Sequence, residues 1–384
     1  MRPRKGHDPI KNILMGIAGT MVLIVIGIVI WQNLFMPASS KENPDQVNLQ
    51  KDSEQDGAAS QELTKAKADE VSAEKTVNSS ENKSEAKQED AIASEKEEIN
   101  DAENVGVSAS PAEMAKDAMS ILIGPEDLHS EAAFVWDRQE KAAIFEKNPD
   151  KHMVPASLVK MMTVYSALQV IEDMNAQAPV DVNSYLEMVE SNASMAGFFG
   201  NEPTTYRDLL FGTMLPSGGE AAASLAINTL GSLDAFVYQM NTTAQGFGLT
   251  NTSFGNVSGL DVPANYSTAR DMAMFLDQAL EDPNFREIFT ARSYVSTSTE
   301  DHPEGVEMYS TVLARLDPAS LDAAGFQVLG GKSGTELAGQ NWATLGVKEG
   351  KEYIVITMGA PLGDLNAPND FQIDDTVSLY SAIP

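Results

Sequence analysis

The sequence of 384 residues has no cysteine and only four histidines. The lack of cysteine excludes disulfide bonds, iron–sulfur clusters, thiolate zinc sites and a cysteine nucleophile. The histidines do not have the spacing of a metal-binding motif such as HExxH, so we expect no metal ion. Basic residues are also scarce, since 26 Lys and Arg accompany 56 Asp and Glu, for a net charge of -30. This charge excludes a nucleic-acid-binding protein, which needs a basic surface.

Residues 13–36 are predominantly apolar and contain no charged residue. They are long enough to cross a bilayer, which takes about 20 such residues. Because Arg and Lys cluster in residues 1–12, the positive-inside rule predicts a cytoplasmic N-terminus, a single transmembrane helix at 13–36 in the cell membrane, and an extracytoplasmic remainder. The alternative is a cleaved signal peptide with Ala38 and Ser40 near its cleavage site, but such peptides usually have an apolar region of about 7–15 residues.

Residues 37–118 are rich in Glu, Lys, Ser, Ala and Gln and contain no aromatic residue. Such a segment cannot bury enough apolar surface to offset the entropy lost on ordering, so we predict a disordered acidic linker. From residue 119 the sequence becomes apolar, with Gly and Pro between the apolar runs. This change predicts one folded domain over residues 119–384.

Strand-like and helix-like patterns follow one another along this domain. We expect strands at residues 132–136, 142–145, 291–298, 306–312, 326–334, 342–348 and 352–360. We expect helices after Pro155 and at residues 205–215, 218–230, 232–246 and 268–281. The order predicts an α/β (α+β) domain in which one antiparallel sheet, built from both ends, is flanked by helices and joined to a helical subdomain.

Ser157 and Lys160 form an S-x-x-K motif at the start of the helix after Pro155. Residues three apart share a helix face, so the hydroxyl and the amine are neighbours. A lysine activates a serine only when burial or a nearby cation lowers the lysine pKa. The structural alternative is a serine that caps the helix and a lysine that reaches solvent. The apolar Met161 and Met162 disfavour this alternative, because they would surround the lysine stem.

Ser217 lies in the loop Leu-Pro-Ser-Gly-Gly-Glu-Ala, residues 215–221, which leads into an Ala-rich helix. Its hydroxyl is a candidate proton relay. In the alternative interpretation Ser217 caps the helix and Glu220 completes a capping box. The sequence supports both interpretations equally.

The third motif, Lys332-Ser333-Gly334-Thr335, follows Gly331 at the end of an apolar strand. It is not a phosphate-binding loop, because the glycine spacing of that loop is absent. We expect an edge strand whose lysine and hydroxyl face a cleft, with the two glycines allowing a substrate backbone to approach. Together the three motifs contain the elements that a lysine-activated serine acyltransferase requires.

These motifs and the segments around them resemble the penicillin-binding D-alanyl-D-alanine carboxypeptidases, low-molecular-mass serine peptidases that act on peptidoglycan. The resemblance covers about residues 120–384 and includes FEKNPDKHMVPASLVKMMT (145–163), GLTNTSFGNVSGLD (248–261), YSTARDMA (266–273) and GGKSGTELAGQNWATLG (330–346). It implies a serine DD-peptidase and β-lactamase-like fold and no cofactor. It also implies peptidoglycan stem peptides as substrates and β-lactams as covalent inhibitors.

The resemblance also implies roles for the motif residues. Ser157 would be the nucleophile and Lys160 its general base, with the nearby Lys332 helping to keep Lys160 neutral. Ser217 would pass protons towards the leaving D-alanine. Lys332 and Ser333 would bind the terminal carboxylate of the substrate. The reaction would remove the terminal D-alanine by acylation and hydrolysis.

The backbone N–H groups of Ser157 and Thr335 would form the oxyanion hole of such an enzyme. Two positions depart from the family pattern, since Gly219 stands where Asn is usual and Ser333 where Thr is usual. The missing amide normally contacts the substrate, so activity is reduced unless another side chain supplies that contact. No arginine follows Arg315. The C-terminal arginine that binds the carboxylate in some relatives is therefore absent.

Two other functions stay open at this point. The same acylation serves transpeptidation, endopeptidase cleavage or β-lactam hydrolysis in related proteins, and product analysis separates these reactions. The departure at Gly219 motivates a different class of function, a non-catalytic, membrane-tethered protein that binds the cell wall.

Overall fold

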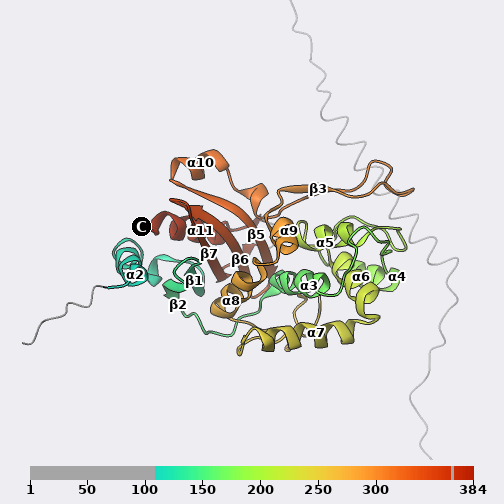
Figure 1. The fold of residues 1–384 in the computed structure, drawn as a ribbon, viewed down its shortest axis with the longest axis horizontal. Helices are drawn as coiled ribbons and strands as arrows, with labels where there is room; N and C mark the ends of the chain where they lie inside the picture. Colours follow the sequence, from blue (N-terminus) through green and yellow to red (C-terminus); the bar gives the residue numbers. More distant parts are fainter. Residues whose placement is uncertain (1–108, 365–366) are drawn as a thin grey trace, which may run out of the picture. The chain divides into compact units, whose positions relative to one another are not determined.

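The computed structural model describes residues 109–364 and 367–384 (Figure 1). The α-helices are α2 (Pro111–Leu122), α3 (Val159–Leu168), α4 (Val182–Glu190), α5 (Tyr206–Met214), α6 (Gly219–Leu230), α7 (Leu233–Gly246), α8 (Ala269–Ala279), α9 (Pro283–Thr290), α10 (Pro318–Ala323) and α11 (Phe371–Ala382). The strands are β1 (Ala132–Asp137), β2 (Ala142–Lys147), β3 (Ser293–Val295), β4 (Glu307–Tyr309), β5 (Phe326–Glu336), β6 (Gly339–Lys348), β7 (Lys351–Ala360), β8 (Gly363–Asp364) and β9 (Ala367–Pro368). Short 3₁₀ helices are η1 (Pro125–Asp127), η2 (Ala156–Leu158) and η3 (Leu313–Arg315).

Five strands form an antiparallel sheet in the order β2-β1-β7-β6-β5, with β5 at one edge. The sheet joins both ends of the domain, because β1 pairs with β7 and places Val135 opposite Val355. The hairpin between β6 and β7 turns at Glu349 and Gly350, whose φ angles of 51° and 79° are those that a two-residue type I′ turn requires. The predicted sheet built from both ends of the domain is confirmed.

Both faces of the sheet are covered. Ile354 and Ile356 of β7 belong to one core with residues of α3 and α8, whereas Tyr353 and Val355 belong to a second core with residues of α2 and α11. Successive side chains of a strand point to opposite faces, so a strand buried on both faces needs an uninterrupted apolar run. The sheet therefore has a protected interior, and its edge strand β5 borders the helical region.

Helices α3 to α7 form the helical subdomain, drawn from green to yellow beside the sheet in Figure 1. Helix α6 lies at its centre and packs against α3, α4, α5 and α7. Residues 221–223 of α6 are three fully buried alanines. Their small side chains let the neighbouring helices approach closely. This packing places the starts of α3 and α6 near the sheet.

Helix α2 extends the folded domain into the segment predicted to be linker. It begins at Pro111 behind a capping box, in which Ser110 Oγ accepts from Glu113 N at 3.2 Å and the Glu113 carboxylate accepts from Ser110 N at 2.7 Å. Met119 of this helix is fully buried in the core that α11 shares. The folded part of the chain therefore begins before the predicted boundary between residues 118 and 119. Composition concealed the helix, because its Ala, Glu and Lys match those of the linker.

The strands expected at 291–298 and 306–312 do not join the main sheet. The observed strands β3 and β4 are shorter than predicted, and they pair with each other as a separate two-stranded ribbon. The ribbon is tied to α5, because the Asp208 carboxylate accepts hydrogen bonds from Tyr294 Oη and Thr297 N, each at 2.9 Å. The sequence patterns also did not predict helices α4, α9, α10 and α11.

Two of the predicted segments lie outside the described residues. These are the transmembrane helix at 13–36 and the linker as far as residue 108. Among the helices of residues 109–364 and 367–384, none combines the length and apolar character needed to cross a bilayer. The anchor and the linker stay predictions.

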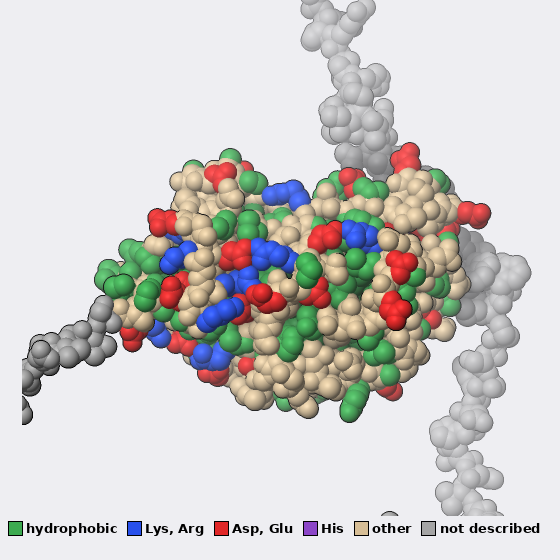
Figure 2. Space-filling view, in the orientation of Figure 1, with side chains coloured by type: hydrophobic (Ala, Val, Ile, Leu, Met, Phe, Trp, Pro, Cys, Tyr) green, Lys and Arg blue, Asp and Glu red, His purple; other side chains and the backbone are tan. Residues whose placement is uncertain are grey.

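Basic and acidic side chains lie side by side on the face shown in Figure 2. Arg138, for example, forms ion pairs with Asp277 at 2.8 Å and with Glu352 at 2.6 Å. Lys160 and Lys332 differ, because neither forms an ion pair with a carboxylate of the described part of the chain. Other basic residues of this part of the chain also lack such a pair, but Lys160 and Lys332 are the two that are buried as well, with exposed fractions of 3% and 0%.

Candidate active site

The predicted Ser157–Lys160 pair lies where β5 and β6 meet the start of α3. Ser157 is on η2, and Lys160 is in the first turn of α3. Lys160 Nζ donates a hydrogen bond to Ser157 Oγ at 3.0 Å. Lys160 is only 3% exposed, and Met161 and Met162 are buried next to it. The structural alternative of a lysine that reaches solvent is therefore wrong.

The backbone before Ser157 is strained. Ala156 has a φ of 50°, in the left-handed region that a residue with a Cβ rarely adopts. Gly259 packs directly on this turn, because a Cβ at Gly259 would lie 2.1 Å from Ala156 O and 2.9 Å from Ser157 N. Only glycine fits at that distance. Strain of this kind persists where the surrounding structure enforces it, and it is common at functional sites.

The loop that carries Gly259 also holds Lys160. Lys160 Nζ donates a second hydrogen bond to Ser258 O, and Gly259 N donates to Asn256 Oδ1 at 2.7 Å. The sequence analysis included this loop in the family resemblance but gave Ser258 no role. The glycine within the segment Asn-Val-Ser-Gly-Leu was the available signal. Ser258 itself acts through its backbone carbonyl, which no side-chain motif reveals.

Ser217 lies between α5 and α6 with a left-handed φ of 69°. Its Oγ accepts a hydrogen bond from Lys332 Nζ at 2.9 Å. Helix α6 has Gly218 at its N-cap and no side-chain capping bond. The capping-box interpretation of Ser217 and Glu220 is therefore wrong. Ser217 instead connects the helical subdomain to strand β5.

Glu220 is a fully buried carboxyl group in the first turn of α6. Its Oε1 accepts hydrogen bonds from Ala196 N at 2.6 Å and Gly197 N at 3.0 Å, whereas its Oε2 has no partner among the described residues. Burial raises the pKa of Glu220, and the backbone N–H groups oppose this effect. The carboxylate also raises the pKa of Lys160, so Glu220 is part of the electrostatic environment of the site.

Gly219, at the position where the family usually has Asn, supplies no side chain to the site. A Cβ at this position would lie 2.8 Å from Met188 Sδ and 3.4 Å from Ala193 Cβ. The Gly219 N–H donates to Ser194 O at 2.7 Å. The loop after α4 therefore packs directly on the start of α6, and Met188 fills the space that a larger side chain would need.

Lys332 and Ser333 lie on the edge strand β5. Lys332 is fully buried and donates to Ser217 Oγ and, at 2.7 Å, to Ser333 O. Ser333 Oγ lies 2.7 Å from Thr311 Oγ1, in the segment that follows β4. The sequence analysis did not single out Thr311, since no motif marks it.

The glycines of β5 allow atoms of neighbouring segments to lie close to the strand. A Cβ at Gly334 would lie 3.1 Å from Ser157 N, and a Cβ at Gly331 would lie 2.7 Å from Val312 Cγ1. The close approach predicted for a substrate is thus made by neighbouring protein atoms. Thr335, the next residue of the strand, has an exposed side chain and follows directly on the contact with Ser157.

Burial controls the protonation of both lysines. It lowers the pKa of Lys160 to about 8, while the charges of Glu220 and Glu336 oppose this effect. The pKa of Lys332 is well below its ordinary value, because the side chain is buried and because Lys160 repels its charge. The predicted lowering for Lys160 agrees with the structure, but burial is its cause and not Lys332.

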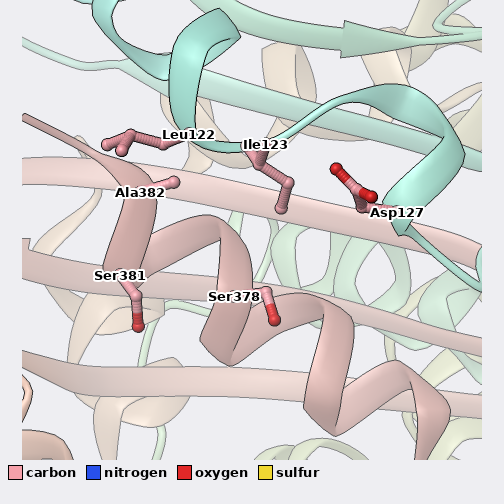
Figure 3. Close-up of a pocket in the computed structure, with 6 residues that line it drawn as sticks. All are labelled: Leu122, Ile123, Asp127, Ser378, Ser381 and Ala382. Carbon is pink, nitrogen blue, oxygen red and sulfur yellow. The ribbon is translucent and has the colours of Figure 1, made fainter.

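A hollow between the ends of α2, η1 and α11 lies apart from these residues (Figure 3). Its lining residues are Leu122, Ile123, Asp127, Ser378, Ser381 and Ala382. None of the residues singled out in the sequence lines it. Within the described part of the chain, no group of three His, Asp or Glu side chains is placed to hold a metal ion.

The fold and the two Ser–Lys pairs are typical of lysine-activated serine acyltransferases. Residues 115–362 match the family model Peptidase S11, described as D-alanyl-D-alanine carboxypeptidase. The chain therefore belongs to this family.

Curated relatives are similar over part of their length. D-alanyl-D-alanine carboxypeptidase DacF of Bacillus subtilis is 30% identical over 156 residues, which are 40% of this chain and 39% of DacF. A D-alanyl-D-alanine endopeptidase of Escherichia coli is 29% identical over 195 residues, 50% of this chain and 61% of that protein. A D-alanyl-D-alanine carboxypeptidase of Streptomyces sp. K15 is 32% identical over 162 residues, 40% of this chain and 55% of that protein. The chain spans about half the length of the curated relatives it matches.

A solved structure shares the fold. The crystal structure of the Streptomyces K15 DD-transpeptidase has a TM-score of 0.58 and 22% sequence identity. The match covers 66% of this chain and 97% of the K15 chain. It supports the arrangement of sheet and helices described above.

Proposed function

We propose that this protein is a serine-type D-Ala-D-Ala carboxypeptidase that removes the terminal D-alanine from peptidoglycan stem peptides. The hydrogen bond of 3.0 Å between Ser157 Oγ and the buried Lys160 Nζ carries the proposal. Because burial lowers the pKa of Lys160 to about 8, a neutral fraction is present near neutral pH and can accept the serine proton.

In the acylation step, Lys160 takes the proton of Ser157 while Ser157 Oγ bonds to the carbonyl carbon of the penultimate D-alanine. Backbone N–H groups of Ser157 and Thr335 stabilise the negative charge on the carbonyl oxygen. The contact between Gly334 and Ser157 N supports this pairing. Ser217 then passes this proton from Lys160 to the leaving amine. The C–N bond breaks and D-alanine departs.

Hydrolysis of the acyl-serine ester completes the reaction. Neutral Lys160 takes a proton from a water molecule whose oxygen attacks the acyl carbon, the ester C–O bond breaks, and the proton returns to Ser157 Oγ. One water is consumed, and the products are D-alanine and the shortened peptide. Gly219 supplies no amide to either step. The carbonyl of Ser258 gives Lys160 its second hydrogen-bond partner instead.

Lys332 and Ser333 bind the terminal carboxylate of the substrate in this proposal. Lys332 is buried without a carboxylate partner among the described residues, so a substrate carboxylate would supply the missing counter-charge. β-Lactams that carry a carboxylate would enter the same site and acylate Ser157. Strand β5 is an edge strand, and an extended peptide can pair with a free strand edge.

We also propose that residues 13–36 anchor the protein in the cell membrane. Residues 1–12 would lie in the cytoplasm and the folded domain outside, where peptidoglycan is present. The acidic linker would then separate the active site from the bilayer. The apolar run and the basic residues before it support this proposal.

A second candidate is the same acylation with another bond or acceptor. One similar protein is named an endopeptidase, and the K15 structure is that of a transpeptidase. The products separate these reactions, because only the carboxypeptidase releases free D-alanine from an uncross-linked pentapeptide and leaves a tetrapeptide. A transpeptidase would join the acyl group to an amine acceptor.

The test is D-alanine release from a pentapeptide ending in D-Ala-D-Ala, with the full chain in detergent. Ser157→Ala should lower the rate by at least about 10⁴-fold. Ser166→Ala is the matched control, because Ser166 is a buried serine of α3, the helix that follows Ser157, and its hydroxyl has no partner among the described residues. It should retain wild-type release. A wild-type protein that binds muropeptides but releases no D-alanine contradicts the proposal and supports the wall-binding alternative.

A further inference from the structure

Thr311 occupies a place in the site that the proposed mechanism does not use. Its Oγ1 lies 2.7 Å from Ser333 Oγ, and its N–H donates to Leu215 O at 3.2 Å. These contacts join strand β5 to the loop before α6. Its neighbours Ser310 and Val312 are buried, whereas Thr311 is partly exposed. The segment is thus fixed by its flanks, and the threonine hydroxyl is held beside Ser333.

The hydroxyls of Thr311 and Ser333 have two hydrogen-bond donors between them, and only one of these is used in the structure. Two O–H groups at 2.7 Å share a single hydrogen bond, so one proton is free for a third group. Neither hydroxyl forms another hydrogen bond within the described residues. Lys332 Nζ lies in the same stretch of β5, bonded to Ser217 Oγ and Ser333 O. A pair of hydroxyls next to a buried amine is rich in donors and fits a ligand that only accepts hydrogen bonds.

A carboxylate is such a ligand, because its two oxygens only accept hydrogen bonds. Its negative charge would also provide the counter-charge for Lys332. Arginine often binds carboxylates through two parallel hydrogen bonds. Two arginines belong to this region, and both are engaged elsewhere. Arg292, whose carbonyl accepts from Ser310 N at 2.9 Å, donates to Leu313 O at 3.1 Å, and Arg315 of η3 forms an ion pair with Asp370. Hydroxyl donors are therefore the alternative means of holding the second carboxylate oxygen.

We propose that Thr311 binds the terminal carboxylate of the substrate, with its hydroxyl and that of Ser333 each donating to one carboxylate oxygen. The hydrogen bond between the two hydroxyls is exchanged for two bonds to the ligand, and Lys332 supplies the charge. This inference rests on the proposed function and adds a specificity residue to it. It makes Thr311 a determinant of selectivity for a free carboxylate over an uncharged C-terminus.

The test is the affinity of the full chain in detergent for two peptides that differ only at the C-terminus. One ends in D-Ala-D-Ala acid and the other in D-Ala-D-Ala amide, and calorimetry in a Ser157→Ala background measures binding without turnover. Thr311→Val removes the hydroxyl but keeps the shape of the side chain. It should weaken binding of the acid about tenfold and leave binding of the amide nearly unchanged.

Two further variants separate the hydroxyl from the fold. Thr311→Ser retains the hydroxyl and should preserve the selectivity. Thr290→Val removes a partly buried hydroxyl that bonds to Arg286 O at 2.8 Å on α9, outside the site, and should change neither affinity. The inference is overturned if Thr311→Val weakens both peptides equally, if it weakens neither, or if the parent protein shows no preference for the acid. Failure of the proposed function has a different signature, which is an intact preference for the acid without D-alanine release by the wild type.

Discussion

The two lysines of the site are both buried, but the charges around them have opposite signs. Lys160 interacts with two carboxylates, Glu220 and Glu336, which partly offset burial and leave its pKa at about 8. The charge that acts on Lys332 is that of Lys160, which repels it, and the pKa of Lys332 is well below the ordinary value. Burial acts on both side chains alike. The neighbouring charges add to this common effect in opposite directions, since they raise the pKa of Lys160 and lower that of Lys332.

This difference suits two separate tasks. A general base works best when its pKa is close to the working pH, which describes Lys160. A residue that recognises an anion needs its charge only when the anion is present, which describes Lys332. Chemistry and recognition are thus assigned to opposite sides of the site, one on α3 and one on β5. Substitutions at the two lysines should have distinguishable consequences.

The largest effect should follow Lys160→Met. Without the base, acylation of Ser157 should slow about 10³-fold for benzylpenicillin and for its methyl ester alike, because proton transfer is common to both. Fluorescence or mass spectrometry of the acylated chain measures these rates. Lys147→Met is the control, since Lys147 bonds to Leu128 O at 2.9 Å on β2, at the edge of the sheet opposite β5, and should retain the wild-type rate. A loss confined to the carboxylate-bearing compound would contradict the assignment of Lys160 as base.

Lys332→Met should have an intermediate effect that depends on the ligand. Removing one charged hydrogen-bond donor should slow acylation by benzylpenicillin about 30-fold. Acylation by the methyl ester should slow much less, because that compound has no carboxylate to bind. The ratio of the two rates is the measurement. Equal losses for both compounds would show that Lys332 serves the chemical step and would remove the distinction between the lysines.

Glu220→Gln should change the rate of acylation least, and it should raise this rate where the two lysine substitutions lower it. The carboxylate raises the pKa of Lys160, so its removal should move the midpoint of the pH–acylation profile below about 8. At pH 7 more Lys160 is then neutral, and acylation should accelerate about two- to threefold. Glu202→Gln is the matched control, because Glu202 is equally buried but bonds to Phe199 N and His302, and it is not among the carboxylates that act on the pKa of Lys160. A midpoint that rises or stays unchanged would contradict the electrostatic role of Glu220.

Local sequence patterns predicted the parts of the fold that depend on near neighbours. The β1–β2 and β6–β7 hairpins and helices α5 to α8 follow from apolar periodicity and from turn residues such as Gly350. The S-x-x-K pair was also predictable, because residues three apart meet on any helix. Helix α2 was missed although Ser110 and Glu113 mark its start with a capping box, because its composition matches that of the linker and its burial through Met119 depends on distant residues.

The parts of the site that escaped prediction depend on distant neighbours. Ser258 reaches Lys160 across 98 positions of the chain, and Thr311 reaches Ser333 across 22. A capping box was one of two interpretations open for Glu220, but backbone N–H groups 23 and 24 positions away bind its carboxylate instead. A local motif competes with tertiary contacts, and in this site the tertiary contacts prevail.

The central claim is that Ser157 is activated by Lys160, whose pKa is lowered by burial. The most direct measurement is the rate of benzylpenicillin acylation of the wild-type full chain from about pH 6 to about pH 10, with the adduct located by peptide mapping. We expect the adduct on Ser157 and a rate that rises with pH through a midpoint near 8. A flat profile, or a midpoint near the ordinary lysine value of about 10.4, would contradict the claim.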